Sequence, residues 1–386
     1  MRDVVICGVG MTPVGEHWDS SLREIGADAV QLALKDAGLD TVDALYVGNA
    51  FGATFSSQSN VSALIADYAG LGGVEAIGID AADASGGAAL RTGYLAVASG
   101  LVDTVMVVGA EKSTDAIGSA RVAARSVGLD ADYEAVHGAT LTALAGLLMR
   151  RYMYENGLEL PAFEGFSINA HRNAKPNALA MFRNQIKEGA FARASMVSDP
   201  VNLFDGAPDA DGAAAVILTA SERARRMNQP AVRIAGSGAA TDTFSIQERR
   251  DPLRFRAVEL SAQRAFGQAG ILPGEVDLLE AHDAFTIFSV LSLEASGFAS
   301  RGEGWKLAQN AGEALSLKGS LPISTFGGLK ARGNPVGATG VYQAVEAVLQ
   351  LRGQAGGNQV ANARTAVIQS VGGAAATAFT HVLTTR

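Results

Sequence analysis

Residues 83–109 read DASGGAALRTGYLAVASGLVDTVMVVG, and this stretch decides the architecture of the chain. After its glycine-rich start, small and apolar residues at helical spacing run to Gly100, which predicts a helix closed by a glycine C-cap. The β-branched run over residues 104–109 then predicts a buried strand. The same order returns later, because a helical pattern over residues 339–353 precedes an apolar strand at residues 365–369.

A second pair of segments repeats in the same way. Residues 32–39 lead into the apolar run 42–47, and residues 264–272 lead into the run 276–281. Each reads as a helix, a glycine C-cap, a short loop and a strand. Two pairs of matching segments predict an internal duplication of the chain.

The duplication predicts an α/β protein with two βα halves, residues 1–230 and residues 231–386. Near-continuous apolar strands that alternate with helices favour a largely parallel sheet covered on both faces. Residues from about 112 to 200 interrupt this rhythm and are richer in Arg, Asn, Tyr and Met, so we interpret them as an inserted loop domain. A lid or dimer surface is as good an interpretation of this insert as a substrate- and cofactor-binding segment.

Composition excludes several classes of function. Apolar residues make up 48% of the 386-residue chain and charged residues 18%, which is enough apolar surface for a large core. The net charge of −8 and the lack of a basic block argue against nucleic acid as a partner, although a local Arg/Lys site for a phosphorylated ligand fits. No apolar run approaches the roughly 18 residues that span a bilayer, and the first residues read as a strand rather than a signal peptide. We therefore expect a cytoplasmic protein without membrane insertion.

The chain has one cysteine, Cys7, which lies in the predicted first strand. One cysteine allows no intrachain disulfide and no cysteine-based metal cluster, and we expect no metal site. Its position is typical of a small core residue.

Four segments carry residues that could do chemistry, and two of them follow predicted strands. A side chain at the Asp83 turn meets unpaired backbone amides and the positive end of a helix dipole, which stabilise a thiolate or a carboxylate. Asp is also a favoured plain N-cap, and the turn alone favours that structural interpretation. Residues 280–286, EAHDAFT, place His282 after an apolar strand, where doubly wound sheets bind ligands. A structural histidine is the alternative there.

The third segment, residues 327–340, reads GGLKARGNPVGATG and places Gly328 and Asn334 in a loop before a helix. So many glycines indicate a backbone loop folded against a site, and the spacing is not that of a phosphate-binding loop.

The fourth segment, residues 369–374, reads QSVGGA and places Ser370 and Gly373 at a strand end. Its amides could form an oxyanion hole, or the segment could be a tight turn between strands. Because the repeat puts the Asp83 turn and the Asn334 loop before equivalent helices, we expect all four segments to share one crevice.

Taken in order, these motifs resemble those of the thiolase superfamily, specifically its sterol-carrier-protein-X and archaeal acetyl-CoA acetyltransferase branch, often labelled lipid-transfer protein. The resemblance runs nearly end to end and includes VGMTP at 9–13, VGAEK at 108–112, HRNAKPN at 171–177, DGAAA at 211–215, HDAFT at 282–286 and the glycine loop. It implies two βαβαβαββ halves in a five-layered α/β/α/β/α body, usually a homodimer, that acts on acyl-CoA. Members of this branch often pair with a small OB-fold, zinc-ribbon protein, which is therefore a candidate partner.

In an active thiolase, a cysteine at the start of a buried helix takes the acyl group, and the histidine of a Gly-His-Pro motif activates it. By the resemblance, Asp83 stands at that cysteine and Asn334 at that histidine, while Ser370 stands where some thiolases have a second cysteine. His282 alone keeps the family's identity. The resemblance also implies a coenzyme A thioester as substrate or ligand, with no covalently bound cofactor, and Gly328 and Gly373 are assigned to the CoA and acyl pocket.

An aspartate changes the chemistry that the resemblance implies. A carboxylate that attacks a thioester gives a mixed anhydride, which is uphill and hydrolysable. Its reference pKa of about 3.9, against about 8.5 for cysteine, means that no histidine is needed to deprotonate it. The loss of both Cys and His therefore indicates a coordinated change.

Three functions follow as alternatives. The first is an enzyme that works on acyl-CoA by C–C bond or acid–base chemistry without a covalent acyl-enzyme, for example by a retro-aldol reaction on a β-hydroxyacyl-CoA. Asp83 or His282 would be its base, and backbone amides with Asn334 would stabilise an enolate. The second is a non-catalytic acyl-CoA-binding subunit or scaffold. The third is an orthodox acyl-CoA C-acyltransferase, for which Cys7 would be the only thiol.

Overall fold

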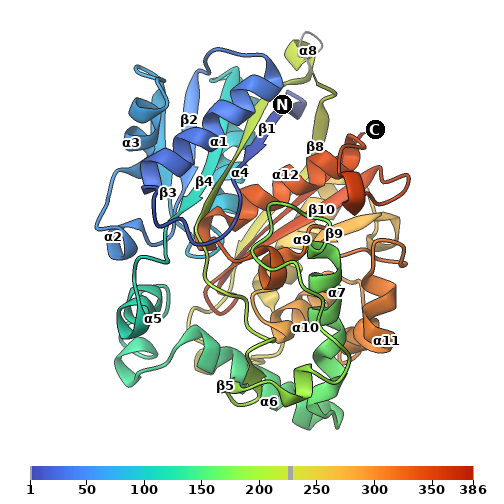
Figure 1. The fold of residues 1–386 in the computed structure, drawn as a ribbon. Coiled ribbons are helices and arrows are strands. Elements are labelled where there is room, and N and C mark those ends of the chain that lie inside the picture. The colour runs from blue at the N-terminus through green and yellow to red at the C-terminus, as the bar shows by residue number, and fades with distance from the viewer. Residues whose placement is uncertain (1, 225–228, 386) are drawn as a thin grey trace.

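The computed structural model describes residues 2–224 and 229–385, which fold around a nine-stranded mixed sheet (Figure 1). Across the sheet the strands lie in the order β3-β2-β4-β7-β1-β8-β11-β10-β9. A separate small sheet pairs β5 with β6. The bounds are β1 Val4–Met11, β2 Ala44–Gly48, β3 Glu75–Ile79, β4 Thr104–Glu111, β5 Met196–Ser198, β6 Val201–Asn202, β7 Gly212–Ala220, β8 Val232–Thr241, β9 Leu278–Glu280, β10 Thr365–Gly372 and β11 Thr377–Thr384.

The two parts of the large sheet have the same topology. In the first, β2 is parallel to β4, β4 is antiparallel to β7, and β7 is antiparallel to β1. In the second, β9, β10, β11 and β8 repeat these relations in the same order. The two parts join where β1 pairs antiparallel with β8 through Val5–Arg233 and Ile6–Val232. The predicted duplication of an α/β unit is confirmed.

The prediction of a largely parallel sheet is wrong. β7 and β11 each run antiparallel to both of their neighbours, and the pair that joins the two parts is also antiparallel. Apolar composition shows that a strand is buried on both faces, but it does not give the direction of the neighbouring strand.

Helices cover the outer faces of the sheet and separate its two parts, which gives the expected five layers. α1 (Leu22–Ala37) and α3 (Val61–Tyr68) pack outside the first part, and α9 (Arg256–Ala269) and α10 (Thr286–Ala295) pack outside the second. α4 (Ser85–Ser99) and α12 (Thr339–Leu351) lie together between them (Figure 1). The two faces of β1 pack against different helices: Ile6 packs with the central helices, and Cys7 packs with α1.

Glycines let the first turns of α4 and α12 meet. A Cβ added at Gly340 would lie 2.3 Å from the backbone nitrogen of Gly87, and one at Gly86 would lie 2.8 Å from the carbonyl oxygen of Gly337. No larger residue fits at such a close approach of two backbones. The glycine-rich starts of the two repeated segments therefore bring equivalent turns of the two halves together.

Residues 112–200 hold α5 (Gly118–Ser126), α6 (Leu141–Asn156), α7 (Glu164–Ala174) and β5, and β6 follows directly after them. α6 packs against α10 (Figure 1). α7 packs against the wide helical turn Gly328–Arg332. The described part of the chain contains no helix that is long and apolar enough to cross a membrane. Three short helices complete the fold: α2 Gly52–Phe55, α8 Ser221–Ala224 and α11 Gln309–Gly312.

Candidate active site

The carboxylate of Asp83 is buried and belongs to an ionic cluster whose other members, Arg125 and Asp209, are partly buried. Asp83 follows β3, and its Oδ1 accepts a hydrogen bond from Nη2 of Arg125 at 2.7 Å. Nη1 of Arg125, which lies on α5, donates to Asp209. The N-cap position of α4 is held by Ala84, and no side chain caps this helix. The plain N-cap interpretation of Asp83 is therefore wrong, because its carboxylate faces a guanidinium instead of the helix amides.

The two carboxylates keep Arg125 charged and fixed. Burial alone would lower the pKa of Arg125, but the charges of Asp209 and Asp83 raise it above its ordinary value. A planar guanidinium that is bonded at two of its nitrogens has little freedom to turn. The result is a cation held between the turn before α4 and the segment before β7.

Asn334 joins this cluster through its backbone. Its N–H donates to the carbonyl oxygen of Pro208 at 3.0 Å, and its carbonyl oxygen accepts from Ala210 at 3.1 Å, on either side of Asp209. Its side-chain oxygen accepts from the backbone of Val336 and from the Thr339 hydroxyl. Because the oxygen is occupied, the side-chain NH2 is the group that Asn334 can offer to a ligand.

His282 is fully buried just after β9 and is neutral at pH 7. Burial lowers its pKa to about 4; the charge of Asp83 opposes this shift, whereas Arg125 and Arg332 add to it. Within the described residues its Nδ1 has no hydrogen-bond partner. His282 is thus close enough to the ionic cluster to feel the charges of Asp83 and Arg125, but at neutral pH its ring is the neutral imidazole and not the imidazolium.

Ser370 lies between the two central helices. Its Oγ donates to the side-chain oxygen of Gln343 on α12 at 3.1 Å, and a Cβ added at Gly87 would touch its side chain at 2.7 Å. The hydroxyl therefore ties β10 to α12, and the side chain packs closely against the start of α4. Gly373 is in the left-handed conformation in the turn between β10 and β11, in agreement with the tight-turn interpretation of this segment.

Gly328 makes room for a neighbouring carboxylate. A Cβ at this position would lie 2.3 Å from Oδ2 of Asp283, and its φ of 55° is left-handed. The Oδ1 of Asp283 accepts from the backbone of Leu329 at 2.7 Å. The glycine loop is thus folded onto the segment that carries His282.

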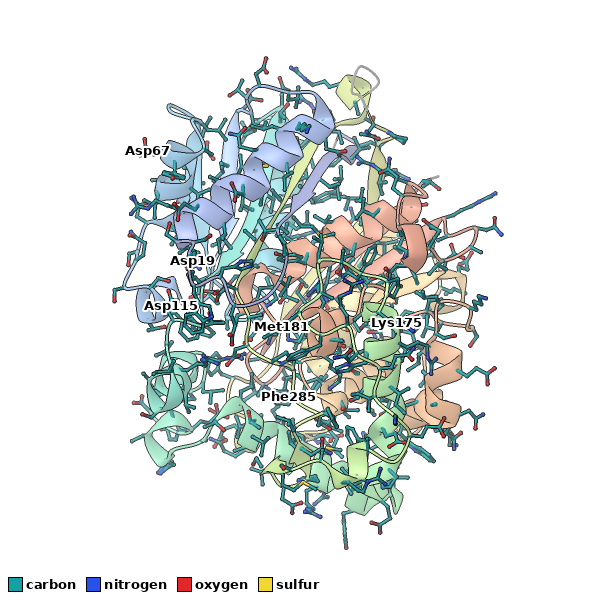
Figure 2. All side chains as sticks on the ribbon, in the orientation of Figure 1. Asp19, Asp67, Asp115, Lys175, Met181 and Phe285 are labelled. Atoms are coloured by element: carbon teal, nitrogen blue, oxygen red, sulfur yellow. The ribbon has the colours of Figure 1, made fainter. Side chains whose placement is uncertain are left out.

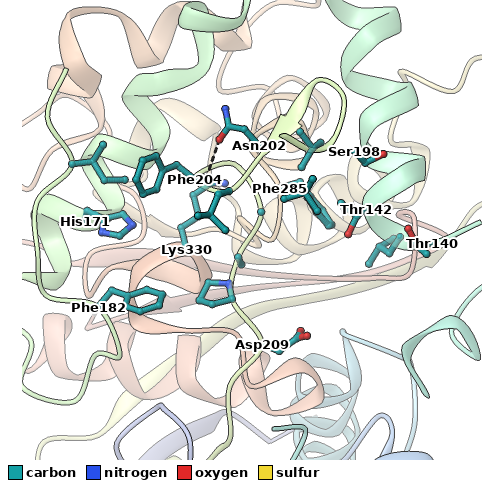
Figure 3. Close-up of a pocket in the computed structure, with 18 of the residues that line it drawn as sticks. Thr140, Thr142, His171, Phe182, Ser198, Asn202, Phe204, Asp209, Phe285 and Lys330 are labelled. Atoms are coloured by element: carbon teal, nitrogen blue, oxygen red, sulfur yellow. Dashed lines mark hydrogen bonds between the residues drawn. The ribbon is translucent and has the colours of Figure 1, made fainter. Parts of the chain in front are cut away.

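A cavity of about 990 Å³ opens beside the ionic cluster (Figure 3). Arg125 and Asp209 line it, whereas Asp83, His282 and Asn334 do not. Its wall comes from α5, α7, the segment around residues 182–209, Phe285 (labelled in Figure 2) and Lys330. Basic side chains on this wall include Arg121, Lys187 and Arg193, and apolar ones include Leu141, Val201, Phe182, Phe204 and Phe285.

The expected single crevice is therefore only partly formed. Arg125 bonds to Asp83 and also lines the cavity, so its guanidinium lies between the cavity and the carboxylate. Ser370 is absent from the cavity lining, and so are Gly328 and Gly373.

The charged residues that meet the cavity were not among those that the sequence motifs singled out. Asp209 stands two residues before the DGAAA motif at residues 211–215, and Lys330 lies inside the glycine loop. Both residues could therefore have been found from the motifs beside them. Arg125 carries no motif of its own, since only the Arg-rich composition of residues 112–200 pointed toward it.

Comparisons with known proteins place the chain in a family. The family model described as "Thiolase, N-terminal domain" matches residues 4–198, and "Thiolase C-terminal domain-like" matches residues 238–385. An acetyl-CoA acetyltransferase from Methanothermobacter thermautotrophicus is 40% identical over 384 residues, which cover 99% of each chain. The chain belongs to the thiolase family.

Other known proteins are similar over most of this chain. "Benzoylsuccinyl-CoA thiolase subunit BbsB" from Thauera aromatica is 31% identical, over 93% of this chain and 91% of its own length. Human sterol carrier protein 2 is 26% identical, over 96% of this chain and 70% of its own length. A solved structure of an "Ltp2-ChsH2(DUF35) aldolase" has the same fold, with a TM-score of 0.86 at 22% identity, and covers 99% of this chain and 98% of that one.

The cysteine of this thiolase-family chain is not placed for catalysis. Cys7 is fully buried on β1, and its Sγ lies 3.5 Å from the carbonyl oxygen of Ile217. Burial raises its pKa to about 12, so the thiol stays protonated at neutral pH. It packs under α1, on the face of the sheet opposite to α4.

Proposed function

We propose that the protein acts on coenzyme A thioesters by acid–base chemistry at the carbon next to the thioester carbonyl, without a covalent acyl-enzyme. The observation that carries this proposal is the Asp83–Arg125–Asp209 cluster beside the cavity, in a chain whose one cysteine is buried elsewhere. Relatives named as acetyl-CoA acetyltransferases support a CoA thioester as the ligand. Basic residues on the cavity wall suit the phosphates of CoA, and its apolar residues suit an acyl chain.

Asp83 is the better candidate for the base. His282 is neutral, but its lowered pKa and the two nearby guanidinium groups disfavour the imidazolium that it would become. In the step we propose, a carboxylate oxygen of Asp83 takes the α-proton, the C–H electron pair forms the C=C bond, and the carbonyl π electrons move to oxygen. The NH2 group of Asn334 and nearby backbone amides then stabilise the enolate.

Asp83 must first become accessible, because Arg125 lies between its carboxylate and the cavity. The thioester carbonyl is a natural acceptor for a guanidinium donor. We propose that an arriving thioester draws Arg125 from Asp83 and so exposes the base. In a retro-aldol cleavage of a β-hydroxyacyl-CoA, Asp83 would take the proton of the β-hydroxyl group, and the O–H electron pair would form the carbonyl of the released aldehyde or ketone. The electron pair of the broken Cα–Cβ bond would form the enolate, to which Asp83 would return the proton at the α-carbon.

The same observation gives a second candidate function. If Arg125 stays on Asp83, the protein would bind acyl-CoA without turning it over, as a subunit or scaffold. Chemistry would then require the small OB-fold, zinc-ribbon partner, and the structural neighbour is itself an aldolase named together with a DUF35 component. An orthodox acyltransferase reaction is the least supported, since the structure offers no accessible thiol among its described residues.

A screen of acyl-CoA thioesters tests the proposal. The protein is incubated with each thioester alone and with a coexpressed OB-fold, zinc-ribbon partner, and products and intact protein are analysed by mass spectrometry. Turnover by the protein alone, with no acyl adduct, supports the enzyme. Binding without turnover in the absence of the partner supports the scaffold, and an acyl adduct on the protein refutes both.

The resemblance also implies a homodimer, and the outer edge of β3 is where we propose that two copies meet. The backbone of β3 pairs with β2 on one side and with no described strand on the other. Ile77 on this strand is 41% exposed. An apolar, unpaired edge strand is a surface that proteins normally cover.

A further inference from the structure

Lys330 is a buried cation with fewer hydrogen-bond acceptors around it than its ammonium group has donors. It lies in the wide turn Gly328–Arg332, only 3% of the residue is exposed, and it lines the cavity. Its Nζ donates to the backbone carbonyl of Asp205. Among the described residues this is its one hydrogen bond, and no carboxylate oxygen comes within ion-pair distance. An ammonium has three N–H donors, so two of them have no protein acceptor.

The nearby carboxyl groups compensate Lys330 only in part. Burial lowers the pKa of Lys330, while the charges of Asp205 and Asp283 act in the opposite direction. Burial also raises the pKa of both carboxyl groups, which favours their neutral forms. A buried charge without enough hydrogen-bond partners is costly, and a ligand that supplies an anionic acceptor removes much of that cost.

The side chains around Lys330 indicate the chemistry of the rest of the ligand. His171 lies in the same cavity wall between Phe182 and Phe204, whose ring centroids are 6.3 and 6.4 Å from its own (Figure 3). Nδ1 of His171 donates to the backbone oxygen of Asn184 at 2.9 Å, so Nδ1 carries a hydrogen. The ring is neutral when Nε2 is not protonated. The cation of Lys330 therefore stands in a largely aromatic wall, which suits a hydrocarbon chain with a charged end.

We propose that Lys330 binds a carboxylate at the far end of the acyl chain, so that the preferred ligands are carboxyacyl-CoA thioesters. The inference rests on the proposed function in one respect only, that the cavity takes a CoA thioester. The carboxylate accepts from the two unused donors of Lys330 in an ion pair sheltered from solvent, while the methylene groups of the chain contact Phe204 and Phe285. Because the site is defined by a charge, it discriminates against neutral chains of the same shape.

Isosteric ligand pairs test this site without any need for turnover. Succinyl-, glutaryl- and adipyl-CoA are each compared by calorimetry with the thioester in which an isopropyl group replaces the carboxylate, namely 4-methylpentanoyl-, 5-methylhexanoyl- and 6-methylheptanoyl-CoA. We expect the wild type to bind the carboxylate member of at least one pair at least about tenfold more tightly, because a hydrogen bond between two charged groups is stronger than one between neutral groups.

Three variants assign the preference to one side chain. Lys330→Met should abolish it and Lys330→Arg should keep it. Lys187→Met removes another lysine from the same cavity wall, and it should weaken both members of each pair alike. If the Met variant does not fold, Lys330→Gln takes its place.

The possible failures can be told apart. Equal affinity for both members of every pair in the wild type overturns the carboxylate site and leaves the proposed function standing. A preference that survives in the Lys330→Met or Lys330→Gln variant also overturns it. If none of the thioesters binds, the proposed function and this inference fall together.

Discussion

Removal of the Arg125 guanidinium is the sharpest test of the ionic cluster. In the variant Arg125→Met, the carboxylates of Asp83 and Asp209 lose their shared cation, and their side chains are only 4% and 18% exposed. Loss of one partner from a buried ion pair costs about 3–5 kcal/mol in the free energy of unfolding. Because the Arg125 side chain is itself 19% exposed, we expect a value at the lower end, about 3 kcal/mol.

A control and a second variant separate the charge effect from lost packing. Arg233→Met breaks an ion pair with Asp3 whose side chains are 46% and 62% exposed, and it should cost less than about 1 kcal/mol. Adding Asp83→Asn to Arg125→Met removes one of the two orphaned charges, and it should restore about 1–2 kcal/mol.

Urea unfolding at pH 7, followed by circular dichroism, gives these free energies. A cost within about 0.5 kcal/mol of zero for Arg125→Met would refute the buried cluster, because surface substitutions fall in that range. So would a double variant that is less stable than Arg125→Met alone. Either result would mean that Arg125 does not hold Asp83 in solution.

Four further predictions follow from the structure and from the resemblance. Incubation with acetyl-CoA or acetoacetyl-CoA should leave the mass of the protein unchanged, and a stable acetyl adduct on the peptide that contains Asp83 would contradict this. Asp83→Cys alone should not restore thiolysis of acetoacetyl-CoA, whereas Asp83→Cys with Asn334→His should reach a higher rate; equal rates would show that Asn334 is not the counterpart of the histidine. Light scattering at micromolar concentration should give a dimer, and Ile77→Glu should give a monomer if the edge of β3 is the interface; a monomeric wild type would rule this out. Burial lowers the pKa of both His282 and His381 to about 4, so the folded chain binds fewer protons than the unfolded chain between pH 6.5 and 4. These two groups therefore reduce the free energy of unfolding as the pH falls through that window. NMR titration of labelled histidines should show both rings neutral at pH 5, and a ring that titrates near pH 6.5 would contradict the burial of that residue.

The architecture was predictable because it depends on local sequence patterns. Each half repeats a helix, a glycine and a strand at recognisable spacing, and the structure has these elements where the repeat put them, for example α4 at Ser85–Ser99 and β4 at Thr104–Glu111. The close approach of the first turns of α4 and α12 at Gly86, Gly87 and Gly340 was not predicted, since the glycines of residues 327–340 were read only as a loop folded against a site. Strand direction was not predicted, because an apolar run shows burial on both faces and not the direction of the neighbouring strand. β11 reverses after residues 373–376 and β7 reverses after the long segment that follows β4, so two different connections lead to the same antiparallel arrangement.

The candidate site was only partly predictable, because its decisive contacts join distant residues. Asp83 was found from its turn, but Arg125, which lies 42 residues further along the chain, forms no motif with it. Ser370 was assigned to the site from its place at a strand end, yet its side chain points toward Gln343 between the central helices. Which way a strand-end side chain points is set by the packing of the helices on either face, and a single sequence does not show that.

Exchange of the α-protons of a thioester tests the central claim most directly. The protein is incubated with acetyl-CoA or succinyl-CoA in D2O, and NMR follows the loss of the protons next to the carbonyl. We predict that the wild type accelerates exchange and that Asp83→Asn slows it at least about 100-fold, as removal of a general base does. Asp209→Asn removes the other carboxylate from Arg125 and should slow exchange much less. An equal decrease in the exchange rate in the two variants, or no accelerated exchange with the wild type, would contradict the assignment of Asp83 as the base.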